Sequence, residues 1–253
     1  MANDPAEGTP VFCGPDSPEK GTEMKTIDKK PLLLRIQAVV LIFALWLSAI
    51  VAVQLLFART GNYLEVRQSS SAPGRFLLQG IACSAFPLLL LVFCAARMKE
   101  DFAGEMFFRL RGKSCRLWTV LLSLVLLGMT AYGLAVKRDG TAVLCGLVYY
   151  LAFVAFPEEF VSRDVCTHLL RREAGQVRYL IPNVLFALMH VFNYTGLFLL
   201  YPEGLGRFLL AFPSLLAIGC LMQYLKEKTG TIWIPVLLHA IIDYRFVFSL
   251  ASK

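Results

Sequence analysis

Seven apolar segments of 18 to 22 residues limit the folds that this sequence can adopt. An apolar run of about 18 residues or more with few charges is typical of a helix that crosses a membrane. The chain is 57% hydrophobic and 17% charged, so a soluble fold would have too little interior for its apolar surface. The segments lie at 36–57, 76–96, 117–136, 142–160, 179–200, 208–225 and 230–250. The sequence therefore predicts an all-α polytopic membrane protein with about seven transmembrane helices.

The distribution of basic residues predicts that the N-terminus faces the cytoplasm. In that orientation the inner segments carry sixteen Lys and Arg residues, Lys226 and Lys228 among them, and the outer segments carry eight. Positive residues mark the cytoplasmic side of membrane proteins. The net charge of +7 thus indicates orientation and contact with anionic lipids, not nucleic-acid binding.

The composition changes along the chain and predicts three regions. Residues 1–30 have almost no apolar period and are expected to form a disordered cytosolic tail. N-terminal transmembrane helices follow over 31–140, with a basic cytoplasmic loop at 97–116 that is either an amphipathic surface helix or a plain loop. Residues 141–253 are predicted to form a helical core.

Charged and imidazole side chains occur inside three of the apolar segments. A charge at the centre of a membrane helix costs about 2.5–3.5 kcal/mol on insertion scales, so such residues are functional candidates. The candidates are Glu158, Glu159, Arg163, His190, His239 and Asp243. The first of these helices is expected to continue past Glu159 towards Arg171.

These side chains are predicted to lie at one depth. At 1.5 Å per residue, Glu158, His190 and His239 are roughly 16–20 Å from the nearest inner basic residue of their own segments. Pro157 directly precedes the glutamates and lacks a backbone N–H, so we expect a bend whose freed carbonyls admit water. The sequence therefore predicts a polar cavity within the membrane.

Helical spacing predicts which of these side chains share a face. Glu159 and Arg163 are four residues apart, in the favourable order for an ion pair. His239 and Asp243 have the same separation and should share one edge of their helix. Glu158 is about 100° from the Glu159 face and is expected to point elsewhere.

Several chemical roles are open for such a set. A buried glutamate and two histidines suit hydrolysis by general acid–base catalysis. The same residues suit a proton relay in a transporter or channel, and each pair alone would suit a packing contact. The sequence has no HExxH, ExxH or GxSxG motif. We therefore predict no metal and no cofactor.

Three motifs on successive segments resemble the CPBP family, the CAAX-protease and bacteriocin-processing intramembrane endopeptidases. They are EExxxR at Glu158–Glu159–Arg163, FxxxH at Phe186–His190 and HxxxD at His239–Asp243. The segment GTIWIPVLLHA, at 230–240, is also similar to the family's approach to its last histidine. The resemblance covers about residues 140–245. It departs from the family pattern at Asp164, where glycine is frequent, and at the final aspartate, where asparagine is common.

The resemblance implies a role for each residue of the motifs. Glu158 would be the general base, and His190 would help to position the attacking water. Glu159 and Arg163 would orient the site. His239 and Asp243 would form the oxyanion side. The family resemblance implies a glutamate mechanism without metal.

We therefore predict an intramembrane endopeptidase that hydrolyses a peptide bond of a membrane-associated peptide or protein substrate by glutamate-activated water. The expected location is the inner membrane of a prokaryotic cell, as a multi-pass protein in contact with membrane lipids and not with nucleic acid. The alternatives are a proton-coupled transporter or channel, and a catalytically silent scaffold or immunity protein. The sequence does not identify the substrate or the oligomeric state.

Overall fold

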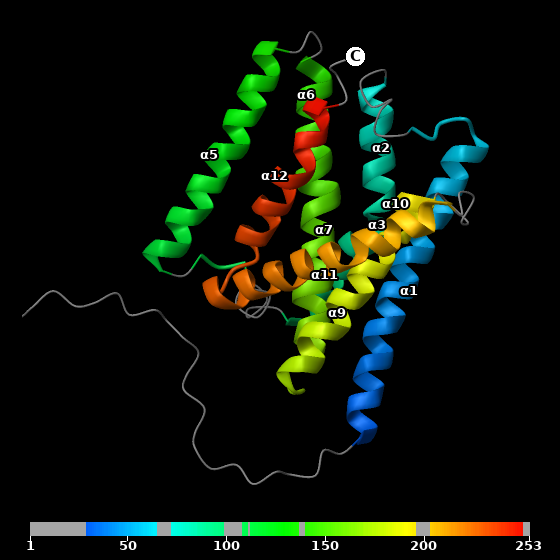
Figure 1. Ribbon diagram of the computed structural model, residues 1–253, viewed down its shortest axis with the longest axis vertical. Helices are drawn as coiled ribbons and strands as arrows, with labels where there is room; N and C mark the ends of the chain where they lie inside the picture. The colour runs from blue at the N-terminus through cyan, green and yellow to red at the C-terminus, as the bar shows by residue number, and fades with distance from the viewer. Residues whose placement is uncertain are drawn as a thin grey trace, which may run out of the picture.

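The computed structural model describes residues 29–64, 72–98, 108–110, 112–136, 140–195 and 203–249, and these residues contain helices and no strands. Figure 1 shows long helices that run side by side, with α11 lying across them. The elements are α1 (Lys29–Arg59), α2 (Pro73–Cys83), α3 (Ala85–Met98), α5 (Lys113–Val136), α6 (Gly140–Val148), η3 (Tyr149–Ala155), α7 (Phe156–Glu159), η4 (Phe160–Val165), α8 (Cys166–Leu169), α9 (Gly175–Met189), α10 (Val191–Thr195), α11 (Glu203–Thr229) and α12 (Trp233–Ser249). The predicted all-α class is confirmed for these residues.

Four helical spans are long and apolar enough to cross a membrane. They are Pro31–Arg59, Lys113–Val136, Gly140–Leu169 and Glu203–Thr229. The pair α2 and α3, bent by 49° at its break, makes a fifth if it counts as one span. Helices α9 and α12 occupy two further predicted segments but have only 15 and 17 residues. The chain is thus an integral membrane protein, and the count of seven spans stays a prediction.

The helix that carries the two glutamates is continuous over Gly140–Leu169, as predicted, but it is not α-helical throughout. The π-helical segments η3 and η4 flank the single α-helical turn of α7. A π-helix bonds residue i to i+5 and often marks a functional site. These segments place the glutamate turn between two widened stretches of helix.

Pro157 lies in α7 directly before the glutamates and has no backbone N–H to donate. In an α-helix, an N–H at this position would bond to the Phe153 carbonyl, and proline has none. That carbonyl accepts a 2.9 Å hydrogen bond from Ser84 Oγ, at the break between α2 and α3. A side chain from a neighbouring helix thus supplies a donor to this carbonyl, and the entry of water stays a prediction. Gly80 permits this approach, since a Cβ there would lie 2.8 Å from the Tyr149 ring.

Part of the predicted basic loop 97–116 is also described. Residues 99–107 and 111 lie outside the described residues, as does most of the predicted tail 1–30. Phe108 is not helical, and its ring stacks on Phe156 and Phe160. Its carbonyl accepts a 3.0 Å hydrogen bond from Trp233 Nε1. This part of the loop therefore packs against the ends of α7 and α12.

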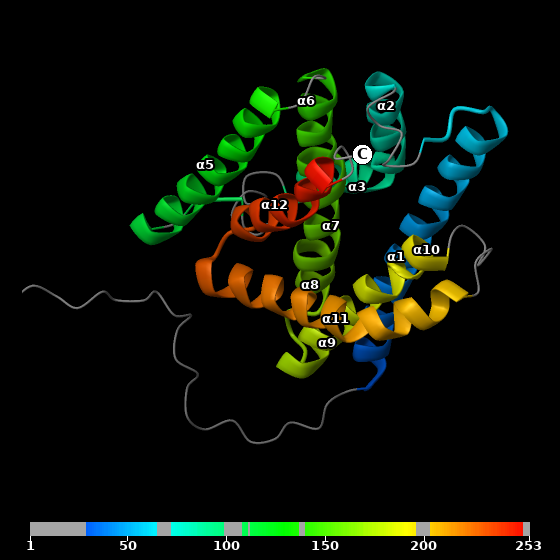
Figure 2. The same ribbon diagram turned by 45° about the horizontal axis from the view of Figure 1, so that its top comes forward.

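Helices α9, α11 and α12 pack against the helix that carries the glutamate turn. Helix α12 packs against α5 and η3, and α11 packs against α9 and α10. In both views of the ribbon, α11 lies obliquely to α1 and to the 140–169 helix (Figures 1 and 2). The oblique course matters for the site, because it carries the C-terminal half of α11 past η4.

Candidate active site

The two glutamates of α7 and the His239 imidazole of α12 form the centre of the site. Glu159 Oε1 lies 2.8 Å from His239 Nδ1, which is a hydrogen bond. Glu158 Oε2 lies 3.7 Å from the other ring nitrogen, Nε2. The prediction that Glu158 points away from the Glu159 contacts is therefore wrong, because the imidazole lies between the two carboxylates and contacts both.

Asp243 joins this group from the next turn of α12. Its Oδ2 lies 3.4 Å from His239 Nε2, which confirms that the two residues share one edge of the helix. His239 therefore faces carboxylates at both of its nitrogens. Because a carboxylate only accepts hydrogen bonds, this environment suits an N–H on each ring nitrogen.

Arg163 lies on the far side of Glu159. Its Nε is 3.3 Å from Glu159 Oε2, and both side chains are fully buried, which confirms the predicted ion pair. The guanidinium carbon lies 4.1 Å from the centroid of the Phe186 ring. A cation over an aromatic face is stabilised by the ring quadrupole. Phe186, the first residue of the FxxxH motif, thus packs against the arginine of the EExxxR motif.

His190 enters the site at the end of α9. Its Nδ1 lies 2.9 Å from the Phe186 carbonyl oxygen, to which it donates as the N–H tautomer. The rings of His190 and His239 lie 4.7 and 6.2 Å from the Phe186 ring, both edge-on. The other nitrogen of His190, Nε2, is then left with a lone pair that can accept a hydrogen bond.

The two glutamates differ in what their oxygens contact. Each Glu159 oxygen has a partner, His239 or Arg163, and its side chain has no exposed surface. The Glu158 side chain is 23% exposed, and its Oε2 lies 3.7 Å from His239 Nε2, beyond hydrogen-bond distance. Glu158 is therefore the carboxylate that another molecule can reach.

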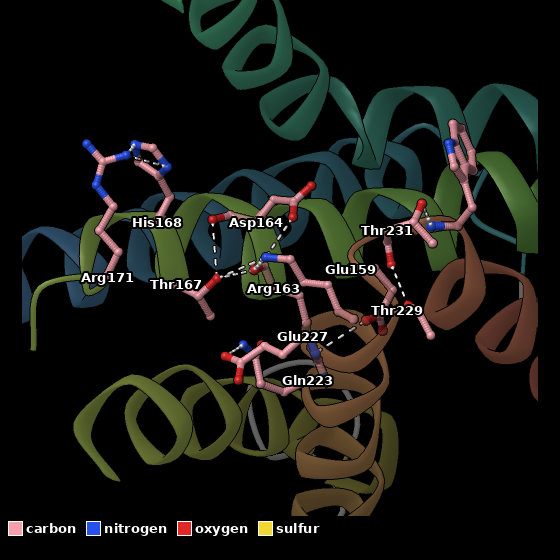
Figure 3. Close-up of polar contacts among 12 residues, drawn as sticks. Glu159, Arg163, Asp164, Thr167, His168, Arg171, Gln223, Glu227, Thr229 and Thr231 are labelled. Carbon is pink, nitrogen blue, oxygen red and sulfur yellow. Dashed lines mark hydrogen bonds and ion pairs between the residues drawn. The ribbon is translucent and has the colours of Figure 1, made fainter. Parts of the chain in front are cut away.

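The structure adds a second polar cluster that we did not predict. Lys226 of α11 is 2% exposed, and its Nζ lies 2.8 Å from Asp164 Oδ1. It also donates to the Arg163 carbonyl and, at 3.2 Å, to Thr167 Oγ1. Figure 3 shows Asp164 and Thr167 beside Arg163 on the helix that carries Glu159.

Lys226, which we counted among the inner basic residues, is thus buried within the protein. Its ammonium is compensated there by Asp164. The sequence held one signal for the pair of Lys226 and Asp164. Position 164 is an aspartate, whereas the family that the sequence resembles frequently has glycine there.

Asn183 of α9 and Gly219 of α11 complete the surroundings of Arg163. Asn183 is 1% exposed and donates to the Tyr179 carbonyl at 2.7 Å. A Cβ on Gly219 would lie 2.7 Å from Asn183 Oδ1 and 3.1 Å from Arg163 Nη2. The glycine thus lets α11 approach the arginine more closely than any other residue would.

Replacing Gly219 by alanine is expected to destabilise the protein by about 1–3 kcal/mol, because the new methyl group displaces Asn183 and Arg163. SDS-induced unfolding in lipid–detergent micelles measures this change. The matched control is Gly206→Ala on the same helix, where a Cβ meets nothing within 4 Å. Equal unfolding midpoints for the two variants would contradict the close contact at Gly219.

Among the described residues, no group of three or more His, Cys, Asp or Glu side chains has the geometry to hold a metal ion. Two grooves are lined mainly by apolar residues of α1, α9 and α10, and neither includes a predicted site residue. The polar cavity stays a prediction.

Comparison with known proteins gives one match. Residues 140–245 match the Rce1-like family, which is described as type II CAAX prenyl endopeptidase Rce1-like. No curated protein and no solved structure matches the chain. The matched residues begin at α6 and include all six of the predicted site residues. The resemblance to the CAAX-protease family is thus confirmed for this membrane protein, whose residues 140–245 are Rce1-like.

Proposed function

We propose that the protein is an intramembrane endopeptidase in which Glu158 activates the attacking water. The family match supports a membrane protease in general. The observation that carries the specific assignment is the difference between the two glutamates. Glu159 has no exposed surface and is held by His239 and Arg163, whereas the Glu158 side chain is 23% exposed.

In the proposed reaction, Glu158 removes a proton from water as the water oxygen forms a bond to the scissile carbonyl carbon. His190 Nε2 accepts a hydrogen bond from the second water hydrogen, because its Nδ1–H is held by the Phe186 carbonyl. Collapse of the tetrahedral intermediate breaks the C–N bond. The proton held by Glu158 then passes to the leaving amine, so protons balance over the cycle.

The oxyanion side of the proposed site is His239. An ionised aspartate cannot donate a hydrogen bond, so Asp243 cannot stabilise the developing charge directly. His239 can, through an N–H at Nε2, and a preorganised donor of this kind lowers the barrier for acyl transfer. Asp243 and Glu159 hold the imidazole from opposite sides, at 3.4 and 2.8 Å. Their role is to orient this donor.

The substrate is proposed to be a membrane-associated peptide, and the family description names a CAAX prenyl endopeptidase. A prenylated CAAX peptide is therefore the first probe, with its unprenylated counterpart as the second. The purified full chain in proteoliposomes is expected to cleave at least one of them, as measured by mass spectrometry of the products. Proton flux across the same liposomes without any cleavage of a peptide panel would favour the transporter alternative and contradict the proposal.

The orientation and location also belong to the proposal. We propose seven spans, with α9 and α12 as the two short ones, the N-terminus inside and the site in a prokaryotic inner membrane. The two-to-one bias of basic residues towards the inner segments supports this orientation. The three predicted regions, 1–30, 31–140 and 141–253, remain the proposed organisation. Reporter fusions in the loops after α3 and after α5 test the orientation, which fails if the loop after α3 reports the outside or the loop after α5 reports the inside.

A further inference from the structure

Helix α11 contacts Arg163 at two places, the guanidinium group and the backbone carbonyl. The backbone of Gly219 lies against the guanidinium, and Lys226, seven residues further along the same helix, bonds to the Arg163 carbonyl. Residues seven apart lie on one helical face. Arg163 is therefore fixed by one face of a helix that supplies none of the six predicted site residues.

The contacts of Lys226 lead directly to the proposed reacting groups. Lys226 fixes the Arg163 backbone, Arg163 Nε pairs with Glu159 at 3.3 Å, and Glu159 bonds to His239 at 2.8 Å. Thr167 strengthens the first link, because its hydroxyl also donates to the Arg163 carbonyl. Arg163 lies in η4, and its carbonyl accepts hydrogen bonds from side chains of α8 and α11.

We propose that Lys226, held by Asp164, is a positioning residue that sets the placement of Arg163, Glu159 and His239 in the site. The expected loss of kcat rests on the proposed function. The expected change in the placement of Arg163, Glu159 and His239 rests on the geometry alone. Asp164 compensates the buried ammonium, and its own side chain has no exposed surface. Neither residue touches the proposed reacting atoms, so both act through Arg163.

Experiment can separate a positioning role of the Lys226–Asp164 pair from a packing contact that only joins α11 to η4. A single Lys226→Met change leaves Asp164 buried without its cation and is expected to reduce the folded fraction. The double variant Asp164→Asn/Lys226→Met removes both charges together and is expected to fold. If the pair only joins α11 to η4, the double variant restores activity along with folding. If Lys226 positions Arg163, activity stays low in the folded double variant.

The first readout is kinetic, with whichever peptide the wild-type protein cleaves. The double variant is expected to lose about 10²-fold in kcat with KM unchanged, because displacement of a catalytic group by about 1 Å costs that much. The matched control is Lys228→Met, the same substitution two residues away at an exposed position, which is expected to retain wild-type kcat.

The second readout does not depend on activity. The chain has three histidines, so selective ¹⁵N-histidine NMR in micelles gives few signals, which single substitutions assign. The double variant is expected to shift the His239 Nδ1 resonance, which reports the Glu159 hydrogen bond, and to leave His168 unchanged. An unshifted His239 signal or wild-type kcat in the double variant overturns the positioning role. Absence of cleavage by the wild-type protein, with the His239 shift present, contradicts only the proposed function.

Discussion

Replacing Glu158 by glutamine is expected to lower kcat for peptide cleavage by about 10²–10⁴-fold, which is the contribution of a positioned general base. Glutamine has nearly the same shape as glutamate but cannot take a proton from water. The variant should still fold and insert, because among the described residues the charge contact of Glu158 is a pair with His239 as long as 3.7 Å. Rates in proteoliposomes, normalised to the folded fraction, measure the effect.

The matched control for this experiment is Glu203→Gln. Glu203 is exposed at the start of α11, so the same change of carboxylate to amide is expected to leave the rate unaltered. Wild-type kcat in the Glu158→Gln variant would contradict the assignment of the base. A loss of rate in both variants would point to a general effect of charge on the substrate or the lipid.

Replacing Arg163 by methionine is expected to destabilise the protein by about 3–5 kcal/mol. Removing one partner of a buried ion pair leaves the other charge uncompensated in a medium of low dielectric constant. Here both side chains are fully buried, so Glu159 would keep only the His239 contact. The change also removes the cation from the face of Phe186. The free energy of unfolding in SDS titrations measures the loss.

Two further variants make this prediction specific to burial. The pair Arg178–Glu227 has the same chemistry at 3.3 Å, but its side chains are 32% and 30% exposed. Arg178→Met is therefore expected to cost no more than about 1 kcal/mol. The double variant Glu159→Gln/Arg163→Met should recover much of the lost stability, because it leaves no unpaired charge. Equal losses for Arg163→Met and Arg178→Met would show that burial of the pair is not the cause.

The positions of the helices were largely predictable from hydropathy, because in lipid every backbone polar group must be bonded within its own helix. The exceptions have local causes. The break between α2 and α3 lies inside the predicted segment 76–96, and Ser84 at that break bonds to the Phe153 carbonyl. The π-helical segments beside Pro157 have no hydropathy signal, since a shift of hydrogen bonds from i+4 to i+5 leaves the apolar pattern almost unchanged.

The contents of the site were predictable where one helix supplies both partners. Glu159 with Arg163, and His239 with Asp243, are four residues apart and meet at 3.3 and 3.4 Å. The placement of Glu158 was not predictable in the same way. Its contact is an imidazole on another helix, and an angle measured around its own helix does not say where that imidazole lies.

The sequence by itself determined that the chain is helical, that it belongs in a membrane, and which side chains share each helical face. These properties depend on the apolar pattern and on the helical repeat, and both are local. Tertiary structure decided which faces meet. Glu159 and His239 are 80 residues apart, and Lys226 and Asp164 are 62 apart, so their contacts depend on how α11 and α12 cross the glutamate helix. Crossing angles follow from side-chain packing between helices, which no local pattern encodes.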